Sequence, residues 1–159
     1  MPIMINRLDN ETISKGLLKV GQVNCHNKSE LIDELFEMEF DLLLVQEPGA
    51  WFKYKKHSSW ACITADDLGD DEQPKAVTYV RQRVLGRMEI VKVGDLTDKN
   101  MVTIRIDNIE ITNIYNRMAE TTKPLSNFMR LVGTRENTPR VVAGDFNLHH
   151  PTWQSWVAP

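Results

Sequence analysis

The chain has 159 residues, of which 42% are hydrophobic and 26% are charged. This length and composition fit one soluble globular domain and exclude the disordered and integral membrane classes. The formal charge of −3 argues against strong non-specific affinity for nucleic acid, although a local basic patch remains compatible with it. Two cysteines are present, and residues 1–7 lack the apolar run of a signal peptide, so we expect an intracellular protein without a membrane span.

The first third of the chain has the pattern of a βαβ unit. Residues 17–23 alternate apolar and other side chains, which is typical of a strand. Residues 27–30 offer an N-cap with a Glu three positions on, and apolar residues at helical spacing over 31–40 predict an amphipathic helix of about three turns. Residues 41–47 form a short apolar run of the kind found in strands buried on both faces. Strand, helix and buried strand together predict a βαβ unit.

Short strands dominate the middle of the chain. Five segments have this pattern: 60–64, 76–81, 88–93, 101–106 and 109–115. The pair Asp107-Asn108 predicts a tight hairpin turn between the last two. Residues 66–72 include five acids, and we expect them to form a solvated loop rather than a metal site.

The last part of the chain predicts one more helix and one more strand. Residues 124–132 have Pro near the first turn, and Gly133 stands where it can end the helix. Residues 140–143 predict a strand, in which 141–143 are apolar, and lead directly into Gly144 and Asp145. We find no internal repeat and no linker, so residues 1–159 are interpreted as a single domain whose core begins at about residue 17.

Polar residues follow three of the predicted strands, namely Asn24, Glu47 and Asp145. In α/β sheets the carboxyl ends of the strands line the ligand crevice, so these side chains could converge there. Two carboxylates and an amide suit Mg²⁺, with Mn²⁺ as the alternative, whereas Zn²⁺ would require His and Cys clusters. Asp145 and Asn147 could also share one reacting group, the Asp accepting a proton and the Asn donating hydrogen bonds. This chemistry indicates phosphodiester hydrolysis.

Five motifs occur along the chain in a fixed order. They are Gln22-Val-Asn-Cys-His-Asn27, Leu43-Leu-Val-Gln-Glu-Pro48, Lys75-Ala-Val-Thr-Tyr-Val80, Asn113-Ile-Tyr-Asn116 and Gly144-Asp-Phe-Asn-Leu-His-His-Pro151. Together they resemble the endonuclease/exonuclease/phosphatase superfamily, and most closely the endonuclease domain of non-LTR retrotransposons of the LINE type. The resemblance implies a four-layer α/β sandwich, metal-dependent nicking of DNA, association with a reverse transcriptase domain and a nuclear location.

The resemblance also implies roles for the three strand-end residues. Glu47 would be the metal-binding Glu of the family, and Asn24 would help to place the metal and the phosphate. Asp145 would orient or deprotonate the attacking water and would contribute to the metal site.

Four further residues follow from the same resemblance. Asn147 would donate to the phosphate in the transition state, and Tyr115 would hydrogen-bond the phosphate or the leaving group. His149 and His150 would lie at the rim of the site, with His149 as a substrate-binding residue. His26 is assigned no role.

Each candidate also has a purely structural interpretation. Glu47 could be a solvated acid at a strand end, and Asn24 and Asn147 could be turn formers, since Asn bonds readily to its own backbone. Tyr115 could be a cross-strand packing residue. Asp145 is harder to explain in this way, because it places an acid where the apolar pattern predicts core.

Complete domains of this superfamily carry a catalytic His in a Ser-Asp-His type motif, paired with an Asp, and this sequence has neither. We therefore expect a C-terminally incomplete domain that lacks the last strands of the second sheet and could pair with a completing segment. The alternative function is an inactive relic or domesticated fragment that acts as a binding module.

Basic residues form two groups outside these motifs. Both are candidates for contacts to DNA phosphates, and both are equally compatible with a solvated surface. The groups are Lys53, Lys55 and Lys56 after Trp51, and Arg81, Arg83 and Arg87 around a strand turn.

Overall fold

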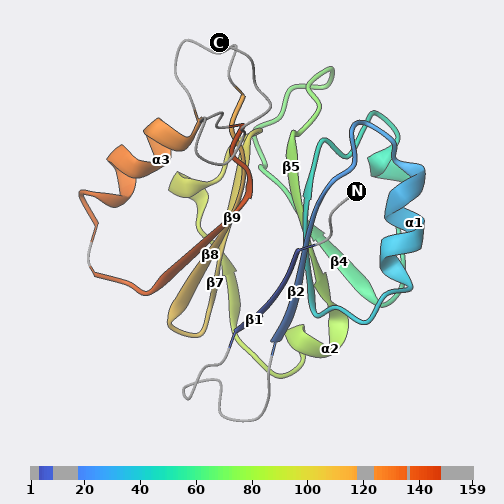
Figure 1. Cartoon of the computed structure of the whole chain (residues 1–159), viewed down its shortest axis with the longest axis horizontal. Helices are drawn as coiled ribbons and strands as arrows, with labels where there is room; N and C mark the ends of the chain where they lie inside the picture. Colours follow the sequence, from blue (N-terminus) through green and yellow to red (C-terminus); the bar gives the residue numbers. More distant parts are fainter. Residues whose placement is uncertain (1–3, 9–17, 118–123, 136, 148–159) are drawn as a thin grey trace, which may run out of the picture.

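Two mixed β-sheets pack face to face, and each carries a helix on its outer side (Figure 1). The computed structural model describes residues 4–8, 18–117, 124–135 and 137–147. The first sheet has the order β1 (Met4–Leu8), β2 (Leu18–Asn24), β3 (Leu42–Gln46), β5 (Ala76–Arg81) and β4 (Trp60–Ile63). The second sheet has the order β6 (Ile90–Lys92), β7 (Met101–Ile106), β8 (Ile109–Tyr115) and β9 (Arg140–Asp145). The predicted four-layer α/β sandwich is confirmed.

The helices are α1 (Glu30–Phe36), α2 (Gln82–Leu85) and α3 (Pro124–Val132), with 3₁₀ turns η1 (Phe52–Tyr54) and η2 (Gly94–Leu96). Helix α1 lies over the outer face of the first sheet and α3 over that of the second (Figure 1). Their apolar side chains pack on these faces. Among the described residues, no helix is long and apolar enough to cross a membrane.

Two parallel strand pairs determine where the sheets present their carboxyl ends. Strand β2 runs parallel to β3, with Asn24 opposite Gln46. Strand β8 runs parallel to β9, with Tyr115 opposite Asp145. The remaining pairs are antiparallel, including the β7–β8 hairpin predicted at Asp107, whose φ of 51° fits a tight turn. Each sheet therefore brings two strand carboxyl ends together at one edge.

The layer between the sheets is apolar over most of its length, and alternate residues of each strand point into it. Its buried members include Leu18 and Val20 of β2, Leu42 and Leu44 of β3, Val102 and Ile104 of β7, and Ile111 of β8. Continuing the same alternation toward the strand ends places Gln22, Asn24, Gln46, Asn113 and Tyr115 on this inner face. The inner layer therefore changes from apolar to polar at the carboxyl ends of the parallel strands.

Helix α1 is shorter than predicted, and its start is also different. It covers seven residues instead of about three turns, and Phe40 is buried beyond its end. The predicted N-cap, Asn27, lies before the helix. Ser29 takes the N-cap position, makes no side-chain capping bond, and donates its Oγ to the Pro48 carbonyl oxygen at 2.8 Å. The Ser29 side chain therefore bonds to the segment that follows β3 and does not cap the helix.

Strand β1, helix α2 and the two 3₁₀ turns were not predicted. Strand β1 pairs antiparallel with β2 although the core was expected to begin at about residue 17, and α2 is too short to show a helical period. Arg81 beside α2 donates from Nε to the Phe40 carbonyl oxygen at 3.0 Å, and Arg83 donates from Nη2 to Asp41 Oδ1 at 2.9 Å. These two arginines therefore stabilise the first sheet at the end remote from the polar strand ends.

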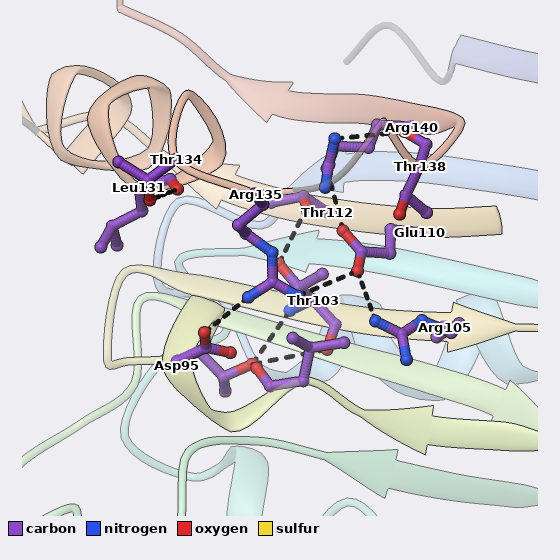
Figure 2. Close-up of polar contacts among 12 residues, drawn as sticks. Asp95, Thr103, Arg105, Glu110, Thr112, Leu131, Thr134, Arg135, Thr138 and Arg140 are labelled. Atoms are coloured by element: carbon purple, nitrogen blue, oxygen red, sulfur yellow. Dashed lines mark hydrogen bonds and ion pairs between the residues drawn. The ribbon is translucent and has the colours of Figure 1, made fainter. Parts of the chain in front are cut away.

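Three arginines surround a buried carboxylate on the outer face of the second sheet (Figure 2). Glu110 is 0% exposed, and it accepts hydrogen bonds from Arg105 at 2.8 Å, Arg140 at 2.9 Å and Arg135 at 3.3 Å. Burial alone would raise the pKa of Glu110, but the bonds and charges of these arginines outweigh it and lower the pKa. The cluster ties the segment that follows α3 to β7, β8 and β9.

Candidate active site

The polar end of the inter-sheet layer begins with a chain of side-chain amides, in which Gln46 and Asn113 are fully buried. Gln22 Nε2 donates to Gln46 Oε1, and Gln46 Nε2 donates to Asn113 Oδ1 at 2.6 Å. Asn113 Nδ2 donates in turn to the Val77 carbonyl oxygen at 2.8 Å. Because Gln46 and Asn113 belong to different sheets, this chain fixes the two sheets relative to each other at the site.

Asn24 and Asp145 meet across the two sheets at the ends of β2 and β9. Asn24 Nδ2 donates to Asp145 Oδ2 at 2.7 Å, and the backbone N–H of Asn147 donates to Asp145 Oδ1 at 3.1 Å. Both carboxylate oxygens are thus oriented by fixed donors. Asn24 Oδ1 accepts the backbone N–H of His26 at 2.7 Å, so the turn-forming interpretation of Asn24 also holds.

Glu47 and Tyr115 form the second contact across the sheets. Tyr115 donates its hydroxyl to Glu47 Oε1 at 2.8 Å. Strand alternation would turn Glu47 to the outer face, but its φ of 46° breaks the alternation directly after β3. A positive φ is uncommon for a residue with a side chain and often marks a functional position. The Glu47 side chain is 17% exposed.

Tyr115 has the clearest electrostatic perturbation of the site. Burial, the hydrogen bond to Glu47 and the charges of Glu47 and Asp145 raise the pKa of Tyr115 to about 12, although Arg117 opposes them. The phenol therefore stays protonated at physiological pH and remains a hydrogen-bond donor.

Asn147 has a structural bond as well as its predicted place at the site. Its Nδ2 donates to the Asn116 carbonyl oxygen at 3.0 Å, and its φ is 45°. The side-chain amide carries a second N–H, which is the one that remains for a ligand.

Asn116 is a site residue that the sequence interpretation missed, although it lies within one of the five motifs. Its backbone N–H donates to the Asp145 carbonyl oxygen at 2.8 Å, and its Nδ2 donates to the Phe146 carbonyl oxygen at 2.8 Å. Its Oδ1 accepts the backbone N–H of Leu125 at 3.1 Å. Asn116 therefore fixes the turn that carries Asp145 and Asn147. A polar residue directly after a buried strand was the available signal.

His26 is also at the site, although no role was predicted for it. Its Nδ1 lies 3.8 Å from Glu47 Oε2, and its φ of 50° turns it out of β2. The imidazole is largely exposed, so it faces the solvent side of Glu47.

The donor set fits a hard divalent cation by its chemistry. Glu47 and Asp145 both act on Tyr115 electrostatically, and Asn24 bonds directly to Asp145. Two carboxylates and the amide oxygen of Asn24 are ligand types that Mg²⁺ accepts, and Mg²⁺ keeps several waters besides. Within the described ranges no group of three or more His, Cys, Asp or Glu could hold a metal, and this includes the acidic residues 66–72.

The structure thus brings together five predicted residues in two contacting pairs and one adjacent turn: Asn24, Asp145, Glu47, Tyr115 and Asn147. His149 and His150 lie outside the described residues. The roles assigned to these residues in binding and catalysis remain predictions.

This architecture defines the chain as an α/β sandwich of the endonuclease/exonuclease/phosphatase type. Residues 109–157 match the family described as endonuclease-reverse transcriptase. The chain is similar in structure to the endonuclease domain of TRAS1, a telomere-specific non-LTR retrotransposon, with a TM-score of 0.66 and 18% sequence identity. The match covers 86% of this chain and 63% of that domain, so the chain spans less than two thirds of its length. None of the curated protein sequences matches this chain. The resemblance predicted from the five motifs is confirmed.

Proposed function

We propose that the chain is a metal-dependent endonuclease of the retrotransposon type that nicks DNA. The observation that carries the proposal is that Glu47 and Asp145 come from different sheets, that each accepts a hydrogen bond from a donor of the opposite sheet, and that the charges of both act on Tyr115. The match to an endonuclease-reverse transcriptase family and the shared fold with a retrotransposon endonuclease support the substrate class.

In this proposal Glu47 and Asp145, with Asn24, would hold Mg²⁺, or Mn²⁺ in its place. The cation would neutralise the charge that develops on the phosphate. Asp145 is oriented by the Asn24 amide and by the N–H of Asn147, so it can orient a water and accept its proton.

Two hydrogen-bond donors of the site remain for the phosphate. Tyr115 is held protonated by the raised pKa of about 12 and can donate to the phosphate or the leaving oxygen once its bond to Glu47 is exchanged. Asn147 can donate its second amide N–H. Donors of this kind stabilise charge in the transition state most effectively when they are fixed beforehand.

The proposed substrate is DNA, and the proposed partner is a reverse transcriptase domain that extends the exposed 3′-hydroxyl. A nuclear location belongs to the same proposal. It rests on the family match over residues 109–157.

The test is nicking of supercoiled plasmid with Mg²⁺ and with EDTA, using the wild type, Asp145→Ala and Asp67→Ala. Asp67 is an exposed acid of the 66–72 loop and controls for loss of a negative charge. We expect Mg²⁺-dependent nicking that falls about 10²–10⁴-fold in Asp145→Ala and is unchanged in Asp67→Ala. No Mg²⁺-dependent nicking by the wild type, or equal nicking by Asp145→Ala, overturns the proposal. DNA binding without any nicking would support the binding-module alternative.

A further inference from the structure

We propose that Trp51 and Tyr54 form a platform on which an unstacked base of the DNA strand stacks, while Lys53 and Lys56 contact the neighbouring phosphates. This inference deepens the proposed function, on which it rests, by naming the form of DNA that the site prefers. The aromatic-lysine surface, defined by these four residues, lies on and beside η1.

The two rings are exposed although burial would stabilise them. Trp51 is 67% exposed and Tyr54 is 64% exposed, whereas the core residue Trp60 is 6% exposed. Their ring centroids are 5.6 Å apart with an interplanar angle of 35°, and Lys53 Nζ lies 5.3 Å from the Tyr54 ring centroid. Exposed aromatic side chains beside lysines are the elements that single-stranded nucleic acid binds, since every base offers a π-face.

The aromatic-lysine surface is held by the fold. The backbone N–H of Tyr54 donates to the Trp51 carbonyl oxygen at 3.0 Å, and Phe52 packs on the core beneath the first sheet. Lys55 forms an ion pair with Asp33 of α1, which ties η1 to that helix. Little ordering of η1 would then be required on binding, which favours affinity.

The surface begins four residues after Glu47. Consecutive Cα atoms are 3.8 Å apart, so the Cα atoms of Glu47 and Trp51 are separated by at most about 15 Å, which a few nucleotides can span. The connection packs closely against the turn after β2, because a Cβ at Gly49, whose φ is 87°, would lie 2.5 Å from the Asn27 carbonyl oxygen. A strand whose phosphate reaches Glu47 would therefore need only a few more nucleotides to reach the rings.

Charge favours a nucleic acid as the occupant. Lys53 and Lys56 are exposed and add positive charge to this surface of a chain whose formal charge is −3. Bases in an intact duplex are stacked and paired, so the rings can stack only on a base that has left the helix. The proposed occupant is a single-stranded or locally opened DNA strand.

The test measures binding in EDTA, so that no cleavage occurs, by fluorescence anisotropy of a labelled oligothymidylate of about 12 nucleotides. A second probe has the same length and backbone but lacks the bases. We expect Trp51→Ala to weaken binding of the oligothymidylate about 10-fold and to leave binding of the base-free probe unchanged. Trp51→Phe should restore most of the affinity, because Phe keeps a stacking face. Met129→Ala, which removes a 59% exposed side chain of α3, is the matched control and should have no effect.

The lysines are tested by salt dependence. The Lys53→Ala/Lys56→Ala double variant should weaken binding of both probes and reduce the slope of log K against log salt by about 1.4, since each single-strand phosphate contact contributes about 0.7. Equal binding of oligothymidylate by the wild type and Trp51→Ala, or an equal loss with both probes, overturns the stacking proposal.

A duplex that contains the same sequence tests whether the surface prefers double-stranded DNA. Tighter binding of the duplex, with the same loss in Trp51→Ala, also overturns the proposal. Trp51-dependent binding without plasmid nicking would refute only the proposed endonuclease function, whereas Asp145-dependent nicking with no effect of Trp51→Ala would refute only the platform.

Discussion

Gln46 of β3 and Asn113 of β8 join the two sheets through a hydrogen bond of 2.6 Å between Nε2 and Oδ1. Both residues are 0% exposed. Gln46 directly precedes Glu47, and Asn113 lies two positions before Tyr115, so this bond fixes the spacing of the strands whose ends carry the Glu47–Tyr115 contact. Fully paired buried amides specify one arrangement of the sheets, because a shifted arrangement would leave them unpaired.

We expect Gln46→Leu to lower the free energy of unfolding by about 2–4 kcal/mol, because it leaves the buried Asn113 Oδ1 and Gln22 Nε2 without this partner. Urea unfolding measures the change. Gln73→Leu, at an exposed loop position, is the matched control and should change stability by less than about 0.5 kcal/mol. A loss no larger than that of the control would contradict the role of the amide chain.

Gly144 permits β9 to lie close to β8 at the last step before Asp145. Its φ is 151°, and an added Cβ would fall on the carbonyl oxygen of Ile114. We expect Gly144→Ala to lower the free energy of unfolding by more than about 3 kcal/mol and to abolish the proposed binding of Mg²⁺ at Asp145.

Gly94→Ala provides the control, since a Cβ at Gly94 has nothing within 4 Å. Thermal unfolding of the two variants should differ clearly, and similar melting temperatures would show that the second sheet adapts at Gly144 without cost.

The sequence predicted the elements that have strong local patterns. Strands β7 and β8 and helix α3 have the predicted bounds, because their apolar periods and end signals are local. Strand β1 was missed because its stability comes from pairing with β2, and α1 was overestimated because Phe40 is buried beyond the end of the helix. Tertiary contacts therefore determine both the formation of β1 and the end of α1.

The same distinction applies to the site. Strand ends identified Asn24, Glu47 and Asp145, since polar residues there interrupt apolar runs. The positive φ of Glu47 and the four bonds of Asn116 could not be predicted, because they depend on strands that meet only in the fold.

Glu110 predicts a specific acid sensitivity. Its pKa is lowered in the fold, so its contribution to stability is present above the unfolded-state value of about 4.3 and is lost as the pH falls through the lower folded value. We expect Glu110→Gln to lower the free energy of unfolding by about 2–3 kcal/mol at pH 7, because the carboxylate pairs with Arg105, Arg135 and Arg140.

The difference between wild type and Glu110→Gln should shrink as the pH falls below the unfolded-state pKa of about 4.3 and toward the lower pKa of the folded state. Denaturant unfolding at a series of pH values measures it. For the control Glu89→Gln, at an exposed position, the free energy of unfolding should change with pH in the same way as for the wild type. A difference that grew as the pH fell would contradict the assigned sign.

Tyr115→Phe removes one hydroxyl and its 2.8 Å bond to Glu47. The raised pKa of about 12 means that the bond contributes fully below the unfolded-state value of about 10 and is lost as the pH rises through the folded value. We expect a loss of about 1 kcal/mol near pH 8 that diminishes above pH 10. In a pH titration followed by ultraviolet absorbance, the wild type should form one tyrosinate near pH 12 that Tyr115→Phe does not form. Formation of that tyrosinate near pH 10 would contradict the contact.

Divalent cations should stabilise the fold if Glu47 and Asp145 bind them as proposed. A ligand that binds only the folded state adds RT ln(1 + [L]/Kd), which is about 1.4 kcal/mol at a tenfold excess over Kd. We expect Mg²⁺ to raise the melting temperature of the wild type and to have little effect on Asp145→Asn, which keeps the shape of the side chain but loses its charge. Asp67→Asn, in the exposed 66–72 loop, should keep the full response. A response lost in Asp67→Asn but kept in Asp145→Asn would assign the cation to the acidic loop instead, and this readout does not depend on any nuclease activity.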